Sequence, residues 1–354
     1  MSKFLNKKYC LLEAYTPGEQ PQDKKYIKLN TNESPYPPSQ GVLEAINGSQ
    51  VSLLNLYPDP ECKELRRNIA AHYGVTESNV FVGNGSDDIL NFAFMAFCGR
   101  DSEAAFPDIS YGFYKVYAEL HGIPYKEIPL TESLEVAAQD YIGINKNVFI
   151  ANPNAPTGLT LSLDEISKIC ESNRDYIVLI DEAYVDFGAE SSASLTQKYG
   201  NLITVMTYSK SRSMAGSRLG FAIANEELVK DLEKIKYSTN PYSINRLTNL
   251  AGIAAIKDSA YYEENCKKIV ETREFTKSEL KKLGFEMTDS KSNFIFAKNS
   301  RIGGEELYKK LKDNGILVRH FSKARIKDYV RITVGTREEM DALISAITDI
   351  LKEL

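Results

Sequence analysis

Leu202-Ile203-Thr204-Val205-Met206-Thr207-Tyr208-Ser209-Lys210 carries an apolar, β-branched run directly into a lysine, and Ala215-Gly216-Ser217-Arg218-Leu219-Gly220 follows closely. The apolar run predicts a buried strand. A lysine at its end becomes a nucleophile when burial or nearby cations lower its pKa and leave the amine neutral. Hydroxyls at Thr207 and Ser209 and the guanidinium of Arg218 are donors that suit a phosphate. The segment predicts a reactive lysine beside an anion site, although a single lysine in a serine-rich loop is most often a solvated surface residue.

Short apolar runs of the same kind alternate with amphipathic segments from about residue 45 to residue 240. The amphipathic segments have apolar residues three and four positions apart, as in Leu163, Ile166 and Ile169, which is typical of helices. Such alternation predicts an α/β fold, with a mostly parallel sheet covered by helices on both faces. Ligands are then expected at the carboxyl ends of the strands. The runs interpreted as strands are Asn79–Val82, Val148–Ile150, Ile177–Ile180, Leu202–Met206 and Leu219–Ala224.

The remaining parts of the chain differ in pattern and predict two more units. The first forty residues contain the proline-rich segment Glu33–Pro38, which favours extended backbone. After the α/β region, helical and strand patterns alternate in a way that suggests a smaller α+β domain, with a helix at about 261–283 and a final helix from about Arg337. We therefore expect an N-terminal arm (1–40), a large cofactor-binding domain (41–245) and a small C-terminal domain (246–354) that packs with the arm.

Composition excludes several classes of function. The chain has 354 residues, 43% hydrophobic and 26% charged, with a formal net charge of −5, so a nucleic-acid partner is not expected. Its five cysteines form no CxxC pair, which favours a reduced cytoplasmic protein without a zinc site. Three dispersed histidines favour neither a metal site nor a Ser/His/Asp triad. No apolar stretch is long enough for a membrane span, and residues 1–8 do not read as a signal peptide.

A glycine turn, Gly83-Asn84-Gly85-Ser86-Asp87-Asp88, lies between a predicted strand and a predicted helix. Glycine allows close backbone approach, and the free amides at a helix start attract an anion. The turn lacks the third glycine of a dinucleotide motif and the lysine of a P-loop, so a nucleotide is disfavoured. It is a candidate phosphate site, although for such a turn taken alone a tight strand-to-helix connection is the commoner explanation.

A second apolar run ends directly in a carboxylate, in Ile180-Asp181-Glu182-Ala183-Tyr184. A buried, ionised Asp181 needs a cationic partner, and a protonated pyridine nitrogen is one. Tyr184 could then donate a hydrogen bond to the oxygen on the same ring. Taken alone, Asp181 is also compatible with a helix N-cap.

Two further loops follow predicted strands. Asn152-Pro153-Asn154-Ala155-Pro156-Thr157-Gly158 is a rigid turn whose asparagines can bond a ligand or the backbone. Pro107–Gly112 presents Tyr111, an aromatic plate for a heterocycle. Each loop alone indicates little. Their combination, however, predicts a site for pyridoxal 5'-phosphate, because the features follow one another in this order: the phosphate turn, the asparagine turn, the aspartate at a strand end, the lysine and the arginine.

At these loops the chain resembles the fold-type I aminotransferases that use pyridoxal phosphate, and within them it is most similar to the histidinol-phosphate aminotransferase family. The resemblance spans nearly the whole chain, and it implies that the sheet is of the seven-stranded type. Four of these loops carry the resemblance: Gly83–Asp87, Asn152–Gly158, Asp181–Tyr184 and Ser209–Arg218. The further segments that carry it are Tyr15–Glu19, Leu29–Pro35, Leu56–Asp59, Phe106–Asp108 and Val330–Thr336.

The resemblance implies a role for each matching residue. Lys210 would bind the cofactor covalently, Asp181 would pair with its ring nitrogen, Tyr184 would contact its ring oxygen and Tyr111 would stack on the ring. Tyr57 would reach the phosphate of the neighbouring subunit's cofactor, which implies a homodimer with active sites at the subunit interface. The phosphate would be surrounded by Gly85, Ser86, Asp87, Thr207, Ser209 and Arg218.

One position departs from the family pattern. The family commonly has asparagine immediately before Pro-Thr-Gly, where it bonds the ring oxygen, and here that residue is Ala155. Asn154 or Asn152 is the candidate replacement, and Tyr184 could carry more of the contact.

For the substrate, the resemblance implies that Arg331 grips its acidic group, that Arg319 is a second cation for the phosphate of histidinol phosphate, and that Tyr15 and Asn32 belong to an arm over the imidazole. Two guanidinium groups suit a phosphate dianion. The implied reaction converts histidinol phosphate and 2-oxoglutarate to imidazole-acetol phosphate and glutamate, and runs in the reverse direction in histidine biosynthesis. Both substrates use one site in turn, which is ping-pong chemistry.

Four alternatives stay open at this point. An aromatic amino acid aminotransferase or a threonine-phosphate decarboxylase would share every cofactor residue and differ at the substrate Cα. A cofactor-binding regulatory module usually comes fused to a DNA-binding domain, for which no room exists before residue 30. A nicotinamide dehydrogenase would need no covalent bond at Lys210.

Overall fold

A computed structural model describes residues 5–354, and its larger part is built on a seven-stranded sheet in the order β2-β8-β7-β6-β5-β3-β4. The pairs β7-β6, β6-β5, β5-β3 and β3-β4 are parallel, whereas β8 runs antiparallel to both of its neighbours. The predicted mostly parallel sheet is therefore confirmed. The strands are β2 (Val80–Gly83), β3 (Ala104–Pro107), β4 (Tyr125–Ile128), β5 (Asn147–Ala151), β6 (Val178–Asp181), β7 (Leu202–Thr207) and β8 (Gly220–Ala224).

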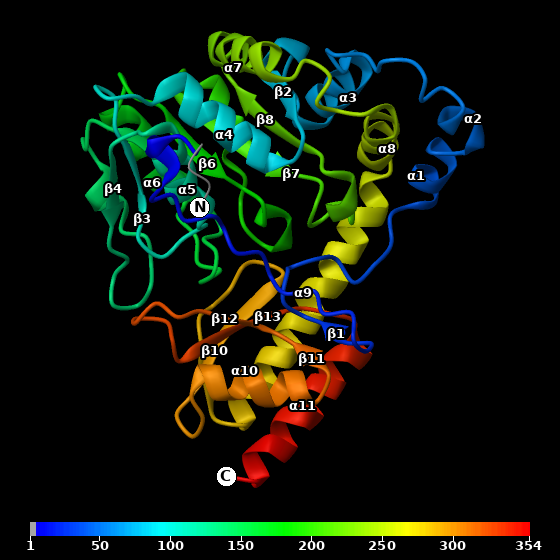
Figure 1. Ribbon diagram of the computed structural model, residues 1–354, viewed down its shortest axis with the longest axis vertical. Coiled ribbons are helices and arrows are strands. Elements are labelled where there is room, and N and C mark those ends of the chain that lie inside the picture. The colour runs from blue at the N-terminus through cyan, green and yellow to red at the C-terminus, as the bar shows by residue number, and fades with distance from the viewer. Residues whose placement is uncertain (1–4) are drawn as a thin grey trace.

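Helices cover both faces of this sheet because its central strands are apolar on both sides. Along β5, for example, Phe149 packs on one face while Val148 and Ile150 pack on the other. One face is covered by α4 (Ser86–Phe97), α5 (Phe113–His121) and α7 (Glu226–Thr239), and the other by α3 (Lys63–Tyr73), α6 (Leu163–Ser172) and α8 (Arg246–Lys257). Two short helices, α1 (Gln40–Ala45) and α2 (Gly48–Val51), lie at the edge of the molecule (Figure 1).

The strand pattern of the sequence misses β3 and β4 for physical reasons. Strand β3, Ala-Ala-Phe-Pro, has no β-branched residue, so it carries little strand propensity. Strand β4 is at the sheet edge, where the polar side chains of Lys126 and Glu127 interrupt the apolar pattern. Both strands are specified by their position in the sheet rather than by local pattern.

The smaller part is built on a four-stranded antiparallel sheet in the order β12-β13-β10-β9. Its strands and helices are β9 (Phe285–Met287), β10 (Phe294–Asn299), β12 (Arg319–His320), β13 (Tyr329–Thr333), α9 (Ser259–Lys282), α10 (Gly304–Asp313) and α11 (Arg337–Lys352). The N-terminal arm joins it, because β1 (Ile27–Lys28) pairs in parallel with β11 (Ile316–Leu317). Short 3-10 helices lie at Lys7–Tyr9, Glu77–Asn79, Ala138–Tyr141, Val185–Phe187, Ser192–Gln197 and Ala215–Ser217.

The chain passes from the larger part to the smaller part in helix α9, which extends through both (Figure 1). The sequence-based boundary at residue 245 puts α8 in the small domain. In the structure Ala251, Ile253 and Ile256 of α8 instead pack in one apolar cluster with Val80 of β2 and Phe221 of β8. The apolar face of α8 is therefore buried against the large sheet. The helical pattern in the sequence predicts that face but does not indicate which element it packs against.

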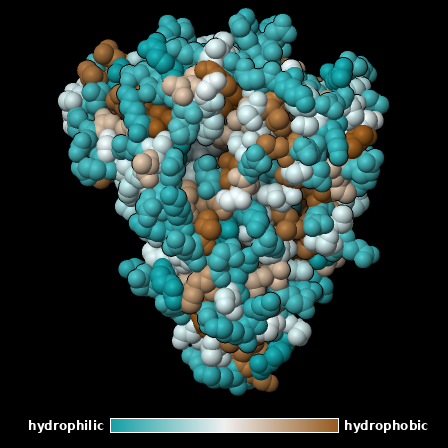
Figure 2. Space-filling view, turned by 180° about the vertical axis from the view of Figure 1, so that it is seen from behind, coloured by the Kyte–Doolittle hydropathy of each residue, from teal (hydrophilic) through white to brown (hydrophobic). Residues whose placement is uncertain are grey.

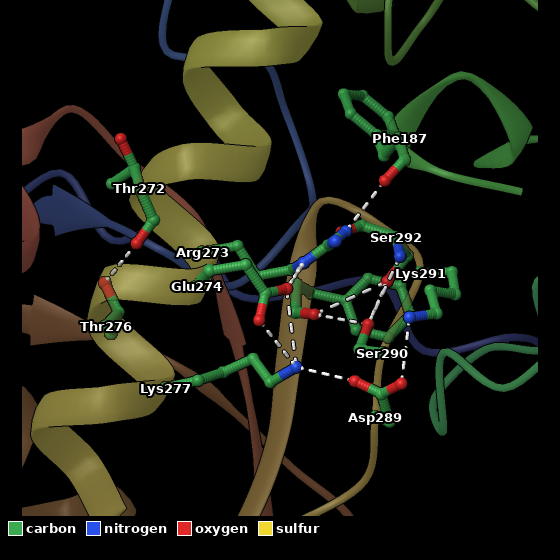
Figure 3. Close-up of polar contacts among 11 residues, drawn as sticks. Phe187, Thr272, Arg273, Glu274, Thr276, Lys277, Asp289, Ser290, Lys291 and Ser292 are labelled. Carbon is green, nitrogen blue, oxygen red and sulfur yellow. Dashed lines mark hydrogen bonds and ion pairs between the residues drawn. The ribbon is translucent and has the colours of Figure 1, made fainter.

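A buried arginine on α9 ties the two parts together (Figure 3). Arg273 Nη1 donates to the carbonyl of Phe187, which follows the Asp181–Tyr184 loop, at 2.8 Å and to the carbonyl of Ser292, before β10, at 2.7 Å. One turn along the helix, Lys277 pairs with Asp289 at 2.7 Å. These contacts hold the loop after β6 and the start of β10 at a defined separation.

The surface is largely hydrophilic and carries dispersed apolar patches on the face that Figure 2 shows. Within residues 5–354, no helix combines the length and the apolar character that a membrane crossing needs.

Candidate active site

The predicted site lies where β5, β6 and β7 end side by side, because the carboxyl ends of parallel strands meet at one sheet edge. The cavity at this edge brings together residues from five separate segments of the chain. Its lining comprises Ser86, Asp87, Tyr111, Ala151, Ala155, Asp181, Ala183, Tyr184, Thr207, Ser209, Lys210 and Arg218. Nine of the predicted cofactor residues therefore line one cavity: Ser86, Asp87, Tyr111, Asp181, Tyr184, Thr207, Ser209, Lys210 and Arg218.

Lys210 projects into this cavity just beyond β7. Its Nζ donates to the Thr31 carbonyl of the N-terminal arm at 3.0 Å and lies 5.8 Å from the centre of the Tyr184 ring. Burial, followed by the charge of Arg331, lowers the pKa of Lys210 to about 8. At pH 7 roughly a tenth of the amine is therefore neutral, far more than for an ordinary lysine, and the neutral form is what nucleophilic chemistry requires.

Asp181 ends β6 and is buried, with 5% of its surface exposed. Its carboxylate accepts hydrogen bonds from the Tyr114 hydroxyl at 3.0 Å and from the Ala183 amide at 3.3 Å. Burial raises the pKa of Asp181 to about 6, although the Tyr114 bond opposes that shift. A buried carboxylate of this kind is stabilised by an adjacent cation.

The opposite end of the cavity is an anion site. The helix α4 begins at Ser86, and its first amides have no side-chain cap, so they and the helix dipole favour negative charge. Arg218 Nη1 reaches Ser209 Oγ at 3.4 Å. A Cβ added at Gly85, whose φ is +85°, would lie 2.7 Å from Arg218 Nη2, and one at Gly220 would lie 2.5 Å from the Ser86 nitrogen. Glycine is therefore required for this close approach.

Asp87 has a different geometry from that of a direct phosphate ligand. Its carboxylate accepts from Arg218 Nη2 at 2.8 Å and from the Tyr111 hydroxyl at 2.6 Å. A carboxylate repels a phosphate, so the Asp87 side chain holds Arg218 and the Tyr111 ring in place while its amide remains part of the helix start. The Tyr111 ring lies against both this cavity and the next one.

Tyr184 and Asn32 are joined directly. Asn32 Nδ2 donates to the Tyr184 hydroxyl at 2.9 Å, and Asn32 Oδ1 accepts from Thr333 Oγ1 at 3.0 Å. The arm thus links the loop after β6 to β13 of the smaller part.

Asn154 and Asn152 are not among the residues that line the cavity. The Asn154 side chain accepts from Ser110 Oγ at 2.8 Å and donates to the Ile109 carbonyl at 3.0 Å. The Asn152 side chain bonds Leu161 at both of its polar atoms. Both asparagines are committed to shaping their loop, and Ala155 is the residue of that turn that reaches the cavity.

A second cavity adjoins the first, since Tyr111 and Ala155 line both. It contains three of the predicted substrate residues, Tyr15, Arg319 and Arg331, and no acidic residue lies among those that line it. Tyr15 stacks on Phe113 with ring centres 4.3 Å apart. Arg331 Nη2 donates to the Asn30 carbonyl at 3.2 Å, while its buried Nε has no partner.

Tyr57 lies outside its own chain's cavities. Its side chain is among the most exposed of the large hydrophobic residues, at 79%, and its ring stacks on Tyr242 at 4.4 Å. Arg246 Nη2 donates to the Tyr57 carbonyl at 3.2 Å.

Sequence reasoning misses Tyr114, which donates to Asp181. Tyr114 lies in the first turn of α5, three residues after Tyr111, and the two ring centres are 5.8 Å apart. Only the sheet, however, brings that turn against the end of β6.

These residues fit pyridoxal phosphate. The cavity has amide, hydroxyl and guanidinium donors at one end, a buried carboxylate at the other, and between them a lysine of lowered pKa. A phosphate, a ring nitrogen and an aldehyde need these three kinds of group. Among residues 5–354, His, Cys, Asp and Glu side chains form no cluster that could hold a metal ion.

Comparison with known proteins gives the same family as the motifs. Residues 24–347 match the family described as Aminotransferase class I and II. The chain is 53% identical over 353 residues to a histidinol-phosphate aminotransferase of Brachyspira hyodysenteriae, covering 99% of this chain and 100% of that protein. It is 49% identical over 351 residues to the enzyme of the same name from Clostridium beijerinckii, covering 99% of this chain and 98% of that protein.

The fold is shared with solved structures. The crystal structure of histidinol-phosphate aminotransferase from Sinorhizobium meliloti in complex with pyridoxal-5'-phosphate superimposes with a TM-score of 0.86, at 23% identity, covering 93% of this chain and 92% of that one. The predicted fold class and the resemblance are both confirmed. The chain belongs to the class I and II aminotransferases and, within them, to the family of the histidinol-phosphate aminotransferases.

Proposed function

We propose that this protein is a pyridoxal-phosphate-dependent transaminase that exchanges the amino group between histidinol phosphate and 2-oxoglutarate, in the histidine-biosynthetic pathway. The observation that carries the proposal is the junction of the two cavities. A lysine of lowered pKa lies in one, and a cavity with Arg319, Arg331 and Lys323 but no acidic lining residue opens beside it. The second cavity suits a phosphate-bearing amine whose nitrogen must reach Lys210.

Each residue has a physical task in this reaction. The bound cofactor supplies an aldehyde carbon and a protonated ring that stabilises the negative charge developing at the substrate Cα. Lys210 Nζ would bind that carbon and, when free, would be the base that takes the proton from the substrate Cα and later returns it. Asp181 would keep the proton on the ring nitrogen. Tyr111 would pack on the ring and Tyr184 would bond its oxygen, while Ser209, Thr207, Arg218 and the start of α4 would hold the phosphate.

The two substrates occupy the second cavity in turn. Histidinol phosphate carries a phosphate-bearing carbon where glutamate carries its α-carboxylate, so both groups are directed to Arg331. Arg319 supplies the further charge for the phosphate dianion. Tyr15, on the arm, closes the cavity over the remainder of the substrate, whereas Asn32 lies outside the lining of that cavity and acts through its bond to Tyr184.

A spectrum and a product assay test the proposed function. The protein reconstituted with pyridoxal phosphate is expected to show a visible band that borohydride abolishes. The reduced cofactor should then be recovered attached to the peptide that contains Lys210. With histidinol phosphate and 2-oxoglutarate it should form glutamate. A protein that takes up no pyridoxal phosphate would overturn the proposal. Release of carbon dioxide from threonine phosphate without glutamate formation would favour a decarboxylase.

The rate at which cofactor-free protein captures pyridoxal phosphate is expected to increase with pH and to level off above about 8, where Lys210 becomes neutral. Because the charge of Arg331 is the second cause that lowers this pKa, Arg331→Leu should shift the midpoint to higher pH. Absorbance changes after mixing, recorded over a pH series that brackets this value, measure both. A midpoint that Arg331→Leu leaves in place would contradict the coupling.

We propose that the protein acts as a homodimer in which Tyr57 completes the partner's phosphate site. Two observations support this. Large apolar side chains are exposed over α1, α2 and the segment that follows, where a second copy would cover them: Leu43, Ile46, Val51, Leu53, Leu54, Leu56 and Tyr57. Near Tyr57, Arg246 donates to the Tyr57 carbonyl. Within the described residues, three polar atoms of this region are buried without a hydrogen-bond partner: Ser243 Oγ, Arg246 Nε and Asn249 Oδ1.

Mixed dimers test this arrangement. Tyr57→Ala and Lys210→Ala proteins, each of low activity alone, are expected to regain activity when they are unfolded together and refolded. In a mixed dimer one of the two sites has Lys210 and receives the intact Tyr57 from the other chain, so about a quarter of normal activity should return if the chains pair at random. Mixing that restores nothing, with mixed dimers demonstrated by different affinity tags, would contradict the shared site.

We further propose that the protein works in the cytoplasm, which its five unpaired cysteines support. We also propose a division into an arm (1–40), a large domain (41–245) and a small domain (246–354), with α8 packed against the sheet of the large domain.

A further inference from the structure

The second cavity contains two like charges that face each other. Strands β12 and β13 are antiparallel, and Arg319 is the direct cross-strand partner of Arg331. Directly opposite side chains in such a pair lie on one face with their Cβ atoms about 5 Å apart, and like charges there are destabilising. The pair therefore needs another group that holds the two guanidinium ions in place.

In the part of the chain that the structure describes, no carboxylate forms an ion pair with either arginine, although the charge of Glu19 interacts with that of Arg319 from further away. Neither arginine has an acidic side chain within ion-pair distance, and both donate to backbone carbonyls of the N-terminal arm. Arg319 reaches the carbonyls of Pro17 and Thr16, each at 3.2 Å, and Arg331 reaches that of Asn30. The buried Nε of Arg331 has no partner.

Phe321 is the group that both arginines share. The guanidinium carbon of Arg319 lies 5.9 Å from the centre of the Phe321 ring, and that of Arg331 lies 5.7 Å from the same centre. An aromatic ring has a negative face that attracts cations at such distances. One ring thus offsets part of the repulsion between the two charges and sets their positions.

The Phe321 ring is itself positioned by the protein core. It contacts Phe296 edge-on, with ring centres 6.2 Å apart, and it packs against a buried cluster that includes Ile326 of the smaller part and Ile109 of the larger part. Phe321 also lines the second cavity. Its orientation is therefore determined by packing that does not depend on the substrate.

We propose that Phe321 is a positioning residue that holds Arg319 and Arg331 at the separation a phosphate group needs, and that it thereby favours the phosphate-bearing substrate over glutamate. The proposal rests on the proposed function, because it assumes that both substrates use the second cavity. A phosphate dianion has three terminal oxygens and accepts from two guanidinium groups at once, whereas the α-carboxylate of glutamate is satisfied by the fork of Arg331 alone. Misplacing Arg319 relative to Arg331 should therefore weaken only the phosphate substrate.

Three variants test Phe321. Phe321→Leu keeps an apolar side chain but removes the aromatic face, and Phe321→Tyr restores that face. Phe275→Leu is the matched control, because Phe275 also lies beneath an arginine, Arg337, but away from both cavities, and the ring centre is 3.2 Å from that guanidinium. The two half-reactions are followed separately on the cofactor-loaded enzyme, and the binding of inorganic phosphate is measured by calorimetry without substrate.

For Phe321→Leu, KM for histidinol phosphate and Kd for inorganic phosphate are expected to increase about tenfold, from the loss of cation–π contact with two arginines. KM for glutamate and kcat should remain close to those of the Phe275→Leu control, and Phe321→Tyr should restore phosphate binding. Equal losses on both substrates would show general damage to the smaller part and overturn the proposal. Unchanged phosphate affinity in Phe321→Leu would also overturn it.

The outcomes separate this proposal from the proposed function. If the unaltered enzyme forms no glutamate from histidinol phosphate and 2-oxoglutarate, the proposed function fails whatever Phe321 does. If the unaltered enzyme is active and Phe321→Leu behaves as Phe275→Leu does, only the role of Phe321 fails.

Discussion

Replacing Lys210 by alanine is expected to lower the turnover of histidinol phosphate by about 10⁴-fold, because one side chain both binds the cofactor and transfers the Cα proton. The Lys210→Ala protein should still bind pyridoxal phosphate, since the donors of the phosphate end are unchanged. After treatment with borohydride, no cofactor should be found attached to the 207–218 peptide. Steady-state glutamate formation and mass spectrometry after borohydride measure the two effects.

A small amine provides the most informative control for Lys210→Ala. Methylamine in the medium can occupy the space of the missing side chain and is expected to restore part of the proton transfer, with a rate that increases with the concentration of its neutral form. Lys230→Ala, which removes an exposed lysine paired with Glu226 on α7, should leave turnover unchanged. Turnover in Lys210→Ala within tenfold of the unaltered enzyme would contradict the assigned role.

Replacing Arg331 by leucine is expected to lower kcat/KM by about 10²- to 10³-fold in both half-reactions, because truncating a partly buried charge partner costs about 2–5 kcal/mol. Both substrates direct an anionic group to this arginine, so the loss should not discriminate between them. Arg331→Lys should recover little, since an ammonium does not reproduce a two-pronged guanidinium contact. Single-turnover measurements with glutamate and with histidinol phosphate provide the comparison.

Arg319→Leu is the matched variant for Arg331→Leu. It removes the cross-strand neighbour and is expected to raise KM for histidinol phosphate while glutamate is little affected. If Arg331→Leu impaired only one substrate, the shared use of Arg331 would be wrong. If Arg319→Leu impaired both substrates equally, the phosphate-specific role of Arg319 would be wrong.

Much of the candidate site could be predicted because its chemistry is local in sequence. Lys210, Asp181 and Gly85 each lie within a few residues of a strand end, and strand ends of a parallel sheet converge on one edge. An apolar run that stops at a charged or glycine-rich residue therefore predicts both the strand and the site. Arg331 is a different case, because it lies in the middle of the antiparallel strand β13 and only the family resemblance indicated it.

Other features could not be predicted, because they depend on contacts between distant segments. The Asp87 carboxylate accepts hydrogen bonds from Arg218 and Tyr111, and the Asn154 side chain is hydrogen-bonded to Ser110 and Ile109. Side chains with several donors or acceptors can serve either a ligand or a neighbouring loop, and local sequence does not indicate which partner is in reach.

The order of loops and strands determined the fold class, the family and the identity of the reactive lysine, because alternating strand and helix patterns and short motifs at strand ends are local properties of the chain. Tertiary structure decided the rest. It placed α8 against the large sheet and brought the Phe321 ring close to two arginines that are twelve residues apart in sequence. Packing and electrostatic balance are properties of side chains in space, so they were settled only when α9, the arm and β13 came together.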